Sequence, residues 1–209
     1  NNEATPSIAL AYLAGFIKDK GYECQIIDAI SEGLNHYWDL KSRPGFICQG
    51  LHFEQIVNLI DPDTEVIGFS IMFSGEWPVM RDLIALVRSR FPRALIVGGG
   101  EHISALPEFT LRDSLSIDIC IKGEGEQVLF EVLECFKDNK DFSKIGGLAY
   151  LDEGENFIET SGVTRIRDVN SIPWPYWPEG YLEKFWDSGK SYGVQSERDM
   201  PIMASRGCP

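Results

Sequence analysis

Long apolar segments are missing from this 209-residue sequence. No run of residues approaches the roughly 20 consecutive apolar positions that a membrane-spanning helix needs. The N-terminal residues also lack the basic segment followed by an apolar segment that defines a secretory signal peptide. The sequence therefore predicts no membrane partner.

Basic residues are scarce, because 19 Lys and Arg stand against 32 Asp and Glu, which gives a formal net charge of −13. A surface that binds nucleic acid needs clustered Lys and Arg to neutralise phosphates. We therefore predict no nucleic-acid partner. The acidity is interpreted as serving solubility.

Cysteine is sparse and scattered. The five cysteines are Cys24, Cys48, Cys120, Cys135 and Cys208. No two have the spacing of a metal-ligand pair, and the odd number argues against a disulfide framework. Since 44% of the residues are hydrophobic, the chain can bury a core without such crosslinks. A cytoplasmic, reducing location is the expectation that follows.

Apolar runs typical of buried strands alternate with amphipathic helices along most of the chain. The predicted strands span residues 22–28, 65–73, 94–97 and 117–121. The predicted helices span residues 7–20, 52–60, 78–90, 105–113 and 126–137. Residues 29–50 are predicted to be irregular. This alternation indicates an α/β fold with a Rossmann-like, doubly wound parallel sheet.

The pattern changes after residue 140. Residues 146–151 and 156–159 are predicted to form a β-hairpin. Proline and tryptophan concentrate at 168–180, which is interpreted as an extended linker packed on a neighbour. The sequence thus predicts three parts, a Rossmann-like domain at 1–140, a hairpin extension at 141–167 and a linker at 168–209.

Both ends of the sequence suggest a piece of a longer protein. The chain has no initiator Met, and its first predicted element is a helix. In a parallel sheet each helix follows a strand, so we expect a first strand upstream of Asn1. The last residues, Gly207-Cys208-Pro209, are an unusual natural terminus.

Three segments that follow buried strands are rich in glycine and serine. They span residues 70–77, 98–104 and 122–127. Ligands of open parallel sheets bind outside the carboxyl ends of the strands. Glycine lets a backbone approach a ligand closely, and serine supplies hydroxyls, so the three loops together could hold a large, flat, mostly neutral ligand. The alternative is that the glycines serve the turns themselves, and for any one loop taken alone this alternative is favoured.

Several short motifs follow one another in a fixed order. They are Ala9–Ala14 with Gly21 and Asp28, Ile67-Gly68-Phe69-Ser70, Gly99-Gly100-Glu101-His102-Ile103-Ser104, Pro107-Glu108, Gly123-Glu124-Gly125-Glu126, Ile172-Pro173-Trp174-Pro175 and Ser205-Arg206-Gly207-Cys208-Pro209. In this order they resemble the cobalamin-binding domain of radical S-adenosylmethionine (radical SAM) enzymes. The last motif resembles the start of that family's S-R-G-C-P-x-x-C-x-x-C cluster sequence.

The resemblance assigns a set of residues to cobalamin. They are Ser70, Met72, Phe73, Ser74, Gly99, Gly100, Glu101, His102, Ser104, Gly123, Glu124 and Gly125. It implies that Ser70, Gly99, Gly100 and Ser104 line the pocket of the nucleotide tail. The 72–77 loop would lie near the corrin ring, and residues 123–126 near the tail. A valine at Gly100 is accordingly expected to abolish binding while the fold is kept.

The family also implies two further cofactors. Cys208 would be the first ligand of a 4Fe–4S cluster that binds SAM in a barrel domain of the same parent protein. Because a cluster needs several thiolates, the chain alone is expected to be inactive. The implied function is that of the cobalamin-binding part of a methyltransferase that uses methylcobalamin, although some relatives catalyse rearrangements or ring closures.

Two other functions stay open at this point. The domain could be a cobalamin-free structural or substrate-recognition module of a radical SAM protein, or an unrelated flavodoxin-like binding module. The sequence also departs from mutases and methionine synthases, which carry a cobalt-binding histidine in D-x-H-x-x-G. Residues 1–7, where that loop is expected, contain no histidine, so we expect no protein histidine on cobalt.

Overall fold

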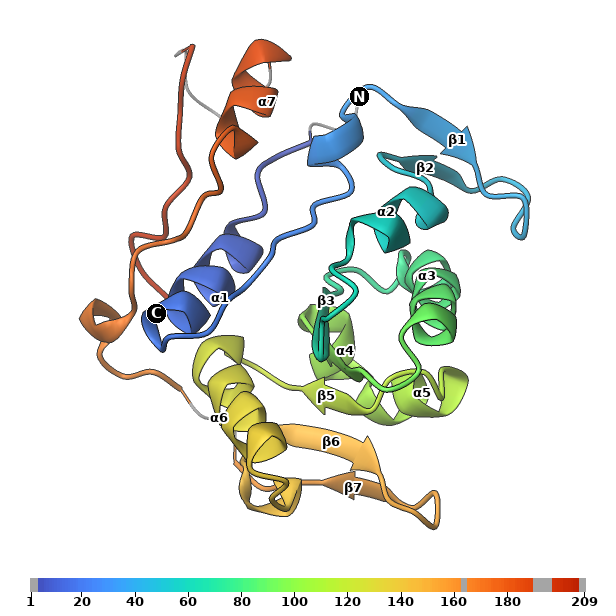
Figure 1. Ribbon diagram of the computed structural model, residues 1–209, viewed down its shortest axis with the longest axis vertical. Helices are drawn as coiled ribbons and strands as arrows, with labels where there is room; N and C mark the ends of the chain where they lie inside the picture. The colour runs from blue at the N-terminus through green and yellow to red at the C-terminus, as the bar shows by residue number, and fades with distance from the viewer. Residues whose placement is uncertain (1–3, 163–164, 190–196, 207–209) are drawn as a thin grey trace. The chain divides into compact units, whose positions relative to one another are not determined.

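The computed structural model describes residues 4–162, 165–189 and 197–206. The chain divides into two compact units. One comprises Ile60–Arg167, and the other comprises Asn1–Leu59 together with Asp168–Pro209 (Figure 1). Among the described residues, no helix combines the length and the apolar character needed to cross a membrane.

The 60–167 unit is built on a five-stranded sheet. Its strands, in spatial order, are β3 (Val66–Ser70), β4 (Leu95–Gly99), β5 (Ile119–Ile121), β6 (Leu148–Leu151) and β7 (Phe157–Glu159). The first three are parallel, whereas β6 and β7 pair antiparallel. The predicted α/β class with a Rossmann-like parallel sheet is confirmed. The predicted hairpin also forms, and it continues the same sheet because Cys120 of β5 pairs with Ala149 of β6.

Helices cover both faces of this sheet. They are α3 (Trp77–Arg90), α4 (Glu101–Ala105), α5 (Pro107–Asp113) and α6 (Gly125–Lys137), with a 3-10 turn, η2, at Phe142–Lys144. Leu95 and Val97 of β4 share a core cluster with Val128 and Val132 of α6. Side chains alternate along a strand, so the fully buried Ile96 faces the opposite side, and Figure 1 shows α3 and α6 on opposite sides of the sheet.

Helix α5 accounts for most of the predicted helix at 105–113, and a separate short helix, α4, precedes it. Leu106 has a non-helical backbone (φ −135°, ψ 49°) and stands directly before Pro107, which begins α5. The proline ring disfavours the helical conformation of the preceding residue, so the chain breaks there. This break separates α4, which carries several predicted site residues, from α5.

The second unit contains the N-terminal helix. Its elements are α1 (Ile8–Asp19), η1 (Ser31–Gly33), β1 (Tyr37–Asp39), β2 (Ile47–Gln49), α2 (Phe53–Leu59), η3 (Val169–Ser171) and α7 (Tyr181–Asp187). The helices α1 and α2 agree with the prediction. The segment predicted as an extended linker lies along α1, where the backbone N–H of Tyr176 donates to the oxygen of Ala11 at 2.9 Å.

Two predictions for this unit are wrong. Residues 22–28 form no strand, because no other described strand pairs with them, and Asp28 ends the segment in a turn by accepting from the N–H of Ile30. The region 29–50, predicted to be irregular, contains the β1–β2 hairpin. Each of its strands has only three residues, too few to show alternation. Helix α7 lies within residues 168–209, the part of the chain predicted to be a linker, and follows the segment 168–180 predicted to be extended.

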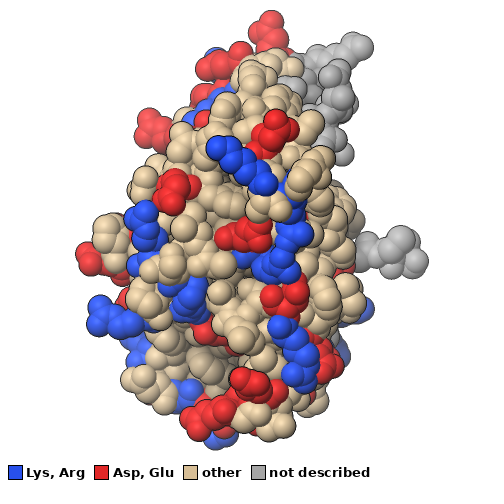
Figure 2. Space-filling view, turned by 90° about the vertical axis from the view of Figure 1, so that its right-hand side faces the viewer, with Lys and Arg blue, Asp and Glu red and all other residues tan. Residues whose placement is uncertain are grey.

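Charged side chains of both signs are interspersed on one face of the molecule. Figure 2 shows acidic and basic residues as neighbours there. Ion pairs in the 60–167 unit include Arg81–Asp113 at 2.7 Å and Arg112–Glu108 at 2.9 Å. Exposed pairs of this kind contribute little stability each.

Candidate functional site

The predicted site residues converge at the carboxyl edge of the three parallel strands. The register pairs Ser70, the last residue of β3, with Gly99, the last residue of β4. The ladder runs one step further, since the N–H of Ile71 donates to the oxygen of Gly99 at 2.8 Å. The loops that follow β3 and β4 therefore start side by side.

Gly99, the last residue of β4, and Gly100, which follows it, have different surroundings. A Cβ built at Gly99 has no atom within 4 Å, so this backbone faces open space. Gly100 has φ +104°, and a Cβ there would lie 2.4 Å from the oxygen of Ile71. Gly100 is thus required by the turn itself, whatever the ligand. Gly99 is the position where a side chain would occupy the open space at this edge.

The loop after β3 is fixed at both ends and exposed between them. Ile71 is fully buried and Trp77 is 3% exposed, with its indole N–H donating to Asp113 at 2.9 Å. Between them, Met72 and Phe73 are 44% and 64% exposed. Two neighbouring exposed apolar side chains on a fixed loop are suited to contact a flat apolar ligand.

His102 lies beneath this loop instead of facing a ligand. It is 2% exposed, and its ring stacks on the Trp77 ring with centroids 5.1 Å apart. Its Nδ1 atom is 2.9 Å from Ser74 Oγ, and its Nε2 atom is 3.2 Å from Thr110 Oγ1. Burial lowers the pKa of His102, which favours a neutral ring. Its neighbour Glu101, by contrast, is exposed.

A hydrogen bond also connects α4, which follows β4, to the loop after β5. The hydroxyl of Ser104 accepts from the N–H of Gly123 at 3.0 Å and keeps its own hydrogen to donate. The carboxylate of Glu124 accepts from the N–H of Ile166 at 2.8 Å. Gly125 begins α6. Glu124 therefore has a structural contact, whereas Ser104 can both join the loops and donate to a ligand.

Sequence reasoning did not identify Thr110 or Trp77 as members of this site. Thr110 is fully buried on α5 and touches the site only through His102. Trp77 lies at the end of a loop that the sequence did single out, but its stacking partner His102 is 25 residues further along the chain. No spacing in the sequence indicates either contact.

Cys208, the predicted first ligand of a 4Fe–4S cluster, lies outside the described residues. Within the described residues, no group of three or more His, Cys, Asp or Glu side chains could hold a metal ion. The four described cysteines are free thiols, and burial raises the pKa of Cys120 to about 12.

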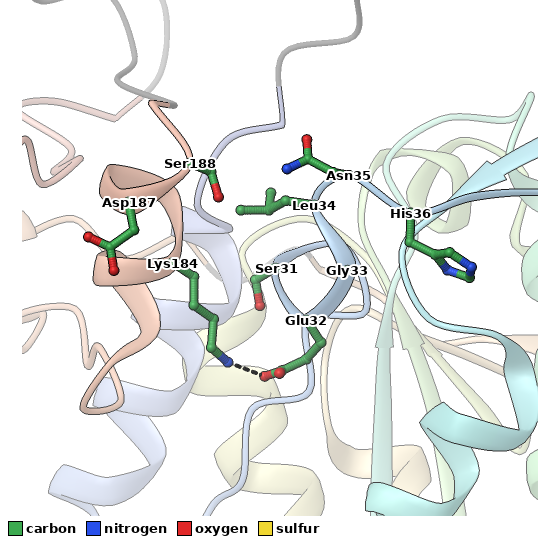
Figure 3. Close-up of a pocket in the computed structure, with 9 residues that line it drawn as sticks. All are labelled: Ser31, Glu32, Gly33, Leu34, Asn35, His36, Lys184, Asp187 and Ser188. Carbon is green, nitrogen blue, oxygen red and sulfur yellow. Dashed lines mark hydrogen bonds and ion pairs between the residues drawn. The ribbon is translucent and has the colours of Figure 1, made fainter.

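The unit formed by residues 1–59 and 168–209 contains a hollow of about 550 Å³, and none of the predicted site residues lines it (Figure 3). It is lined by Ser31, Glu32, Gly33, Leu34, Asn35, His36, Lys184, Asp187 and Ser188. Two of these lining residues, Lys184 of α7 and Glu32 of η1, form an ion pair with each other at 2.5 Å.

Comparison with known protein families identifies the family to which this chain belongs. The sequence profile of the B12 binding domain matches residues 3–133, which include α1, all three parallel strands and the loops that follow them. The chain belongs to the B12-binding domain family. The alternative of an unrelated flavodoxin-like module is therefore wrong.

Particular relatives are longer enzymes. The chain is 26% identical over 98% of its length to an uncharacterized methyltransferase, PH0819, of Pyrococcus horikoshii, and covers 39% of that protein. It is 25% identical over 98% of its length to cytidylyl-2-hydroxyethylphosphonate methyltransferase of Streptomyces wedmorensis, covering 42%. It is 29% identical, again over 98%, to the anaerobic magnesium-protoporphyrin IX monomethyl ester cyclase of Cereibacter sphaeroides, covering 30%. The chain thus spans less than half the length of each relative.

Solved structures share the fold. The cobalamin-dependent S-adenosylmethionine radical enzyme OxsB, with aqua-cobalamin and S-adenosylmethionine bound, superposes with a TM-score of 0.69 at 20% identity. That match covers 87% of this chain and 23% of OxsB. The radical S-adenosylmethionine methyltransferase TsrM of Kitasatospora setae gives 0.60 at 18% identity, covering 88% of this chain and 35% of TsrM.

Proposed function

We propose that this chain binds cobalamin at the carboxyl edge of β3, β4 and β5, as the cobalamin-binding part of a radical SAM methyltransferase. The observation that carries the proposal is the open space at Gly99, directly beside Ser70, at the edge where this family's ligand is expected. A glycine in a strand often marks close approach of a ligand.

The residues at this edge fit such a cofactor in two further ways. Met72 and Phe73 offer exposed apolar surface for the corrin ring. The hydroxyls of Ser70 and Ser104 offer polar contacts for the nucleotide tail. When bound, cobalamin would supply a transferable methyl group, while this chain would hold the cofactor and shield it from water.

The reaction of the parent protein is part of the same proposal. It is supported by two relatives named as methyltransferases and by structural neighbours that are radical SAM enzymes. The 4Fe–4S cluster and SAM would be held by a barrel domain beyond residue 209, with Cys208 as the first cluster ligand. The domain boundaries at 140 and 167 and the cytoplasmic location are proposed from the sequence pattern.

The test is titration of the protein with hydroxocobalamin, followed by visible absorption. We expect a bound spectrum with the parent, weaker binding with Gly99→Ala and loss of binding with Gly99→Val. Glu65→Val is the matched control, because it introduces the same side chain at the amino edge of the same sheet, where Glu65 is exposed. Equal affinity of Gly99→Val and the control would remove cobalamin from this edge. No binding by the parent would favour the cobalamin-free module.

The chain by itself should not cleave SAM, even after reconstitution with iron and sulfide. The product made by the full-length protein would then separate methyl transfer from ring closure, the activity named for the Cereibacter sphaeroides relative. A product with no added methyl group would overturn the methyltransferase proposal while leaving cobalamin binding intact.

A further inference from the structure

The ring of His102 connects a buried helix to an exposed loop. On one side Nε2 is 3.2 Å from Oγ1 of Thr110, which is fully buried on α5. On the other side Nδ1 is 2.9 Å from Oγ of Ser74, which is exposed in the loop after β3. The ring is held between them by stacking on Trp77. A buried imidazole thus contacts the loop that carries the exposed side chains of Met72 and Phe73.

The contacts of Thr110 decide which nitrogen of His102 carries the hydrogen. A threonine hydroxyl has a single hydrogen, and Thr110 donates it to the backbone oxygen of Leu106 at 2.8 Å. A carbonyl oxygen cannot donate in return, so Thr110 Oγ1 must accept from His102. Nε2 therefore carries the hydrogen. Because burial lowers the pKa of His102, the ring is neutral and Nδ1 is an acceptor.

This tautomer fixes the role of Ser74. A serine hydroxyl also has one hydrogen, and an unprotonated Nδ1 receives it. Both lone pairs of Ser74 Oγ then remain as acceptors, and the hydrogen is no longer available to a ligand. An otherwise freely rotating hydroxyl becomes an oriented acceptor in a loop whose ends are buried at Ile71 and Trp77.

We propose that His102 is a positioning residue that makes Ser74 a hydrogen-bond acceptor for a primary amide N–H of the ligand at this edge. The inference rests on the proposed function, since the rim of a corrin ring carries primary amides. His102 touches no ligand atom and acts through Ser74. In this arrangement His102, on α4, serves the site although its own side chain is buried.

The tautomer can be measured without any ligand. In protein labelled with 15N at histidine, two-bond correlations between ring nitrogens and carbon-bound protons show which nitrogen is protonated. We expect His102 to have a protonated Nε2 and an unprotonated Nδ1 at neutral pH. Thr110→Ser should retain this state and Thr110→Val should lose it. A hydrogen on Nδ1, or on both nitrogens, overturns the inference.

A double-mutant cycle with hydroxocobalamin tests the coupling. Ser74→Ala is expected to weaken binding by about 2- to 12-fold, the range for one neutral hydrogen bond. His102→Phe should weaken binding to a similar degree, and the double variant should bind no more weakly than His102→Phe alone. Losses that multiply would show that the two residues act separately and would overturn the proposal.

Failure of this inference is distinguishable from failure of the proposed function. If the parent does not bind hydroxocobalamin, the proposed function fails. If the parent binds and Ser74→Ala binds equally well, cobalamin binding stands and the role of Ser74 is wrong. Should His102→Phe not fold, Thr110→Val replaces it in the cycle, because it removes the acceptor that fixes the His102 tautomer.

Discussion

The hydroxyl of Ser104 accepts a hydrogen bond from the backbone N–H of Gly123 at 3.0 Å. Ser104 lies on α4, after β4, whereas Gly123 follows β5. His102, two residues earlier on the same short helix, contacts Ser74 in the loop after β3. Helix α4 therefore joins all three loops of the carboxyl edge through two side chains.

Removal of the Ser104 hydroxyl should loosen the loop after β5. In Ser104→Ala we expect faster hydrogen exchange at the Gly123 amide and cobalamin binding weakened by about 2- to 12-fold. Hydrogen exchange followed by mass spectrometry on peptides that cover 119–126 measures the first effect. Ser104→Thr keeps the hydroxyl and serves as control. Unchanged exchange in Ser104→Ala would show that the contact does not hold the loop.

Substitution of Gly100 should destabilise the fold even without cobalamin. A side chain there must adopt φ near +104° and lie 2.4 Å from the oxygen of Ile71. We expect Gly100→Ala to lower the free energy of unfolding by about 1–3 kcal/mol, measured by urea denaturation. Gly99→Ala, in open space, should change it by less than about 1 kcal/mol. This differs from the expectation that Gly100→Val keeps its fold. Equal stability of the two alanine variants would contradict the distinction.

Acid should destabilise the 60–167 unit through His102. Its folded-state pKa is lowered from about 6.5 by burial, so protonation favours the unfolded state. The stability it contributes is full above pH 6.5 and is lost as the pH falls from there toward the folded pKa. Glu76 acts in the opposite direction, because burial raises its pKa. Urea unfolding at several pH values, compared with His102→Gln, isolates the histidine. A parallel pH dependence in both proteins would rule this effect out.

Loss of the Tyr181 hydroxyl should destabilise the other unit. This hydroxyl donates to Asp28 at 2.6 Å and accepts from the N–H of Ser7 at 2.9 Å, and Tyr181 is 6% exposed. We expect Tyr181→Phe to lower the free energy of unfolding by about 1–3 kcal/mol, because a buried carboxylate contact is lost. Tyr37→Phe, at a 54% exposed position, should have little effect. Comparable losses in the two variants would contradict the role of Tyr181.

Bound cobalamin should have no protein histidine on cobalt. Residues 1–7 contain none, and His102 is committed to Ser74 and Thr110. Electron paramagnetic resonance of bound cob(II)alamin is expected to show cobalt lines without nitrogen splitting. Triplets that vanish on removal of a histidine would contradict the prediction. Triplets that survive removal of all three histidines would indicate the cofactor's own base.

The sequence alone determined the central sheet and the edge at which the loops after its parallel strands meet. Runs such as Ala94–Val97 are apolar at every position, which is typical of strands covered on both faces, and β4 is buried in that way. Because parallel strands all end at one edge, the glycine- and serine-rich loops after β3, β4 and β5 had to come together. That inference needed only the order of elements along the chain.

Only the tertiary structure decided what depends on partners remote in sequence. Residues 22–28 have the composition of a strand but pair with no strand in the part of the chain that the structure describes. Strand β6 adds to β5 in antiparallel orientation. Gly99 and Gly100 are alike in sequence, yet only the second lies against the oxygen of Ile71. His102 is buried because Trp77 and Thr110 enclose it. Local sequence sets the propensity of a segment for helix or strand and the pattern of its buried residues. The pairing of strands, the close approach of two backbones and the tautomer of a histidine depend instead on which distant atoms the fold brings within a few ångströms.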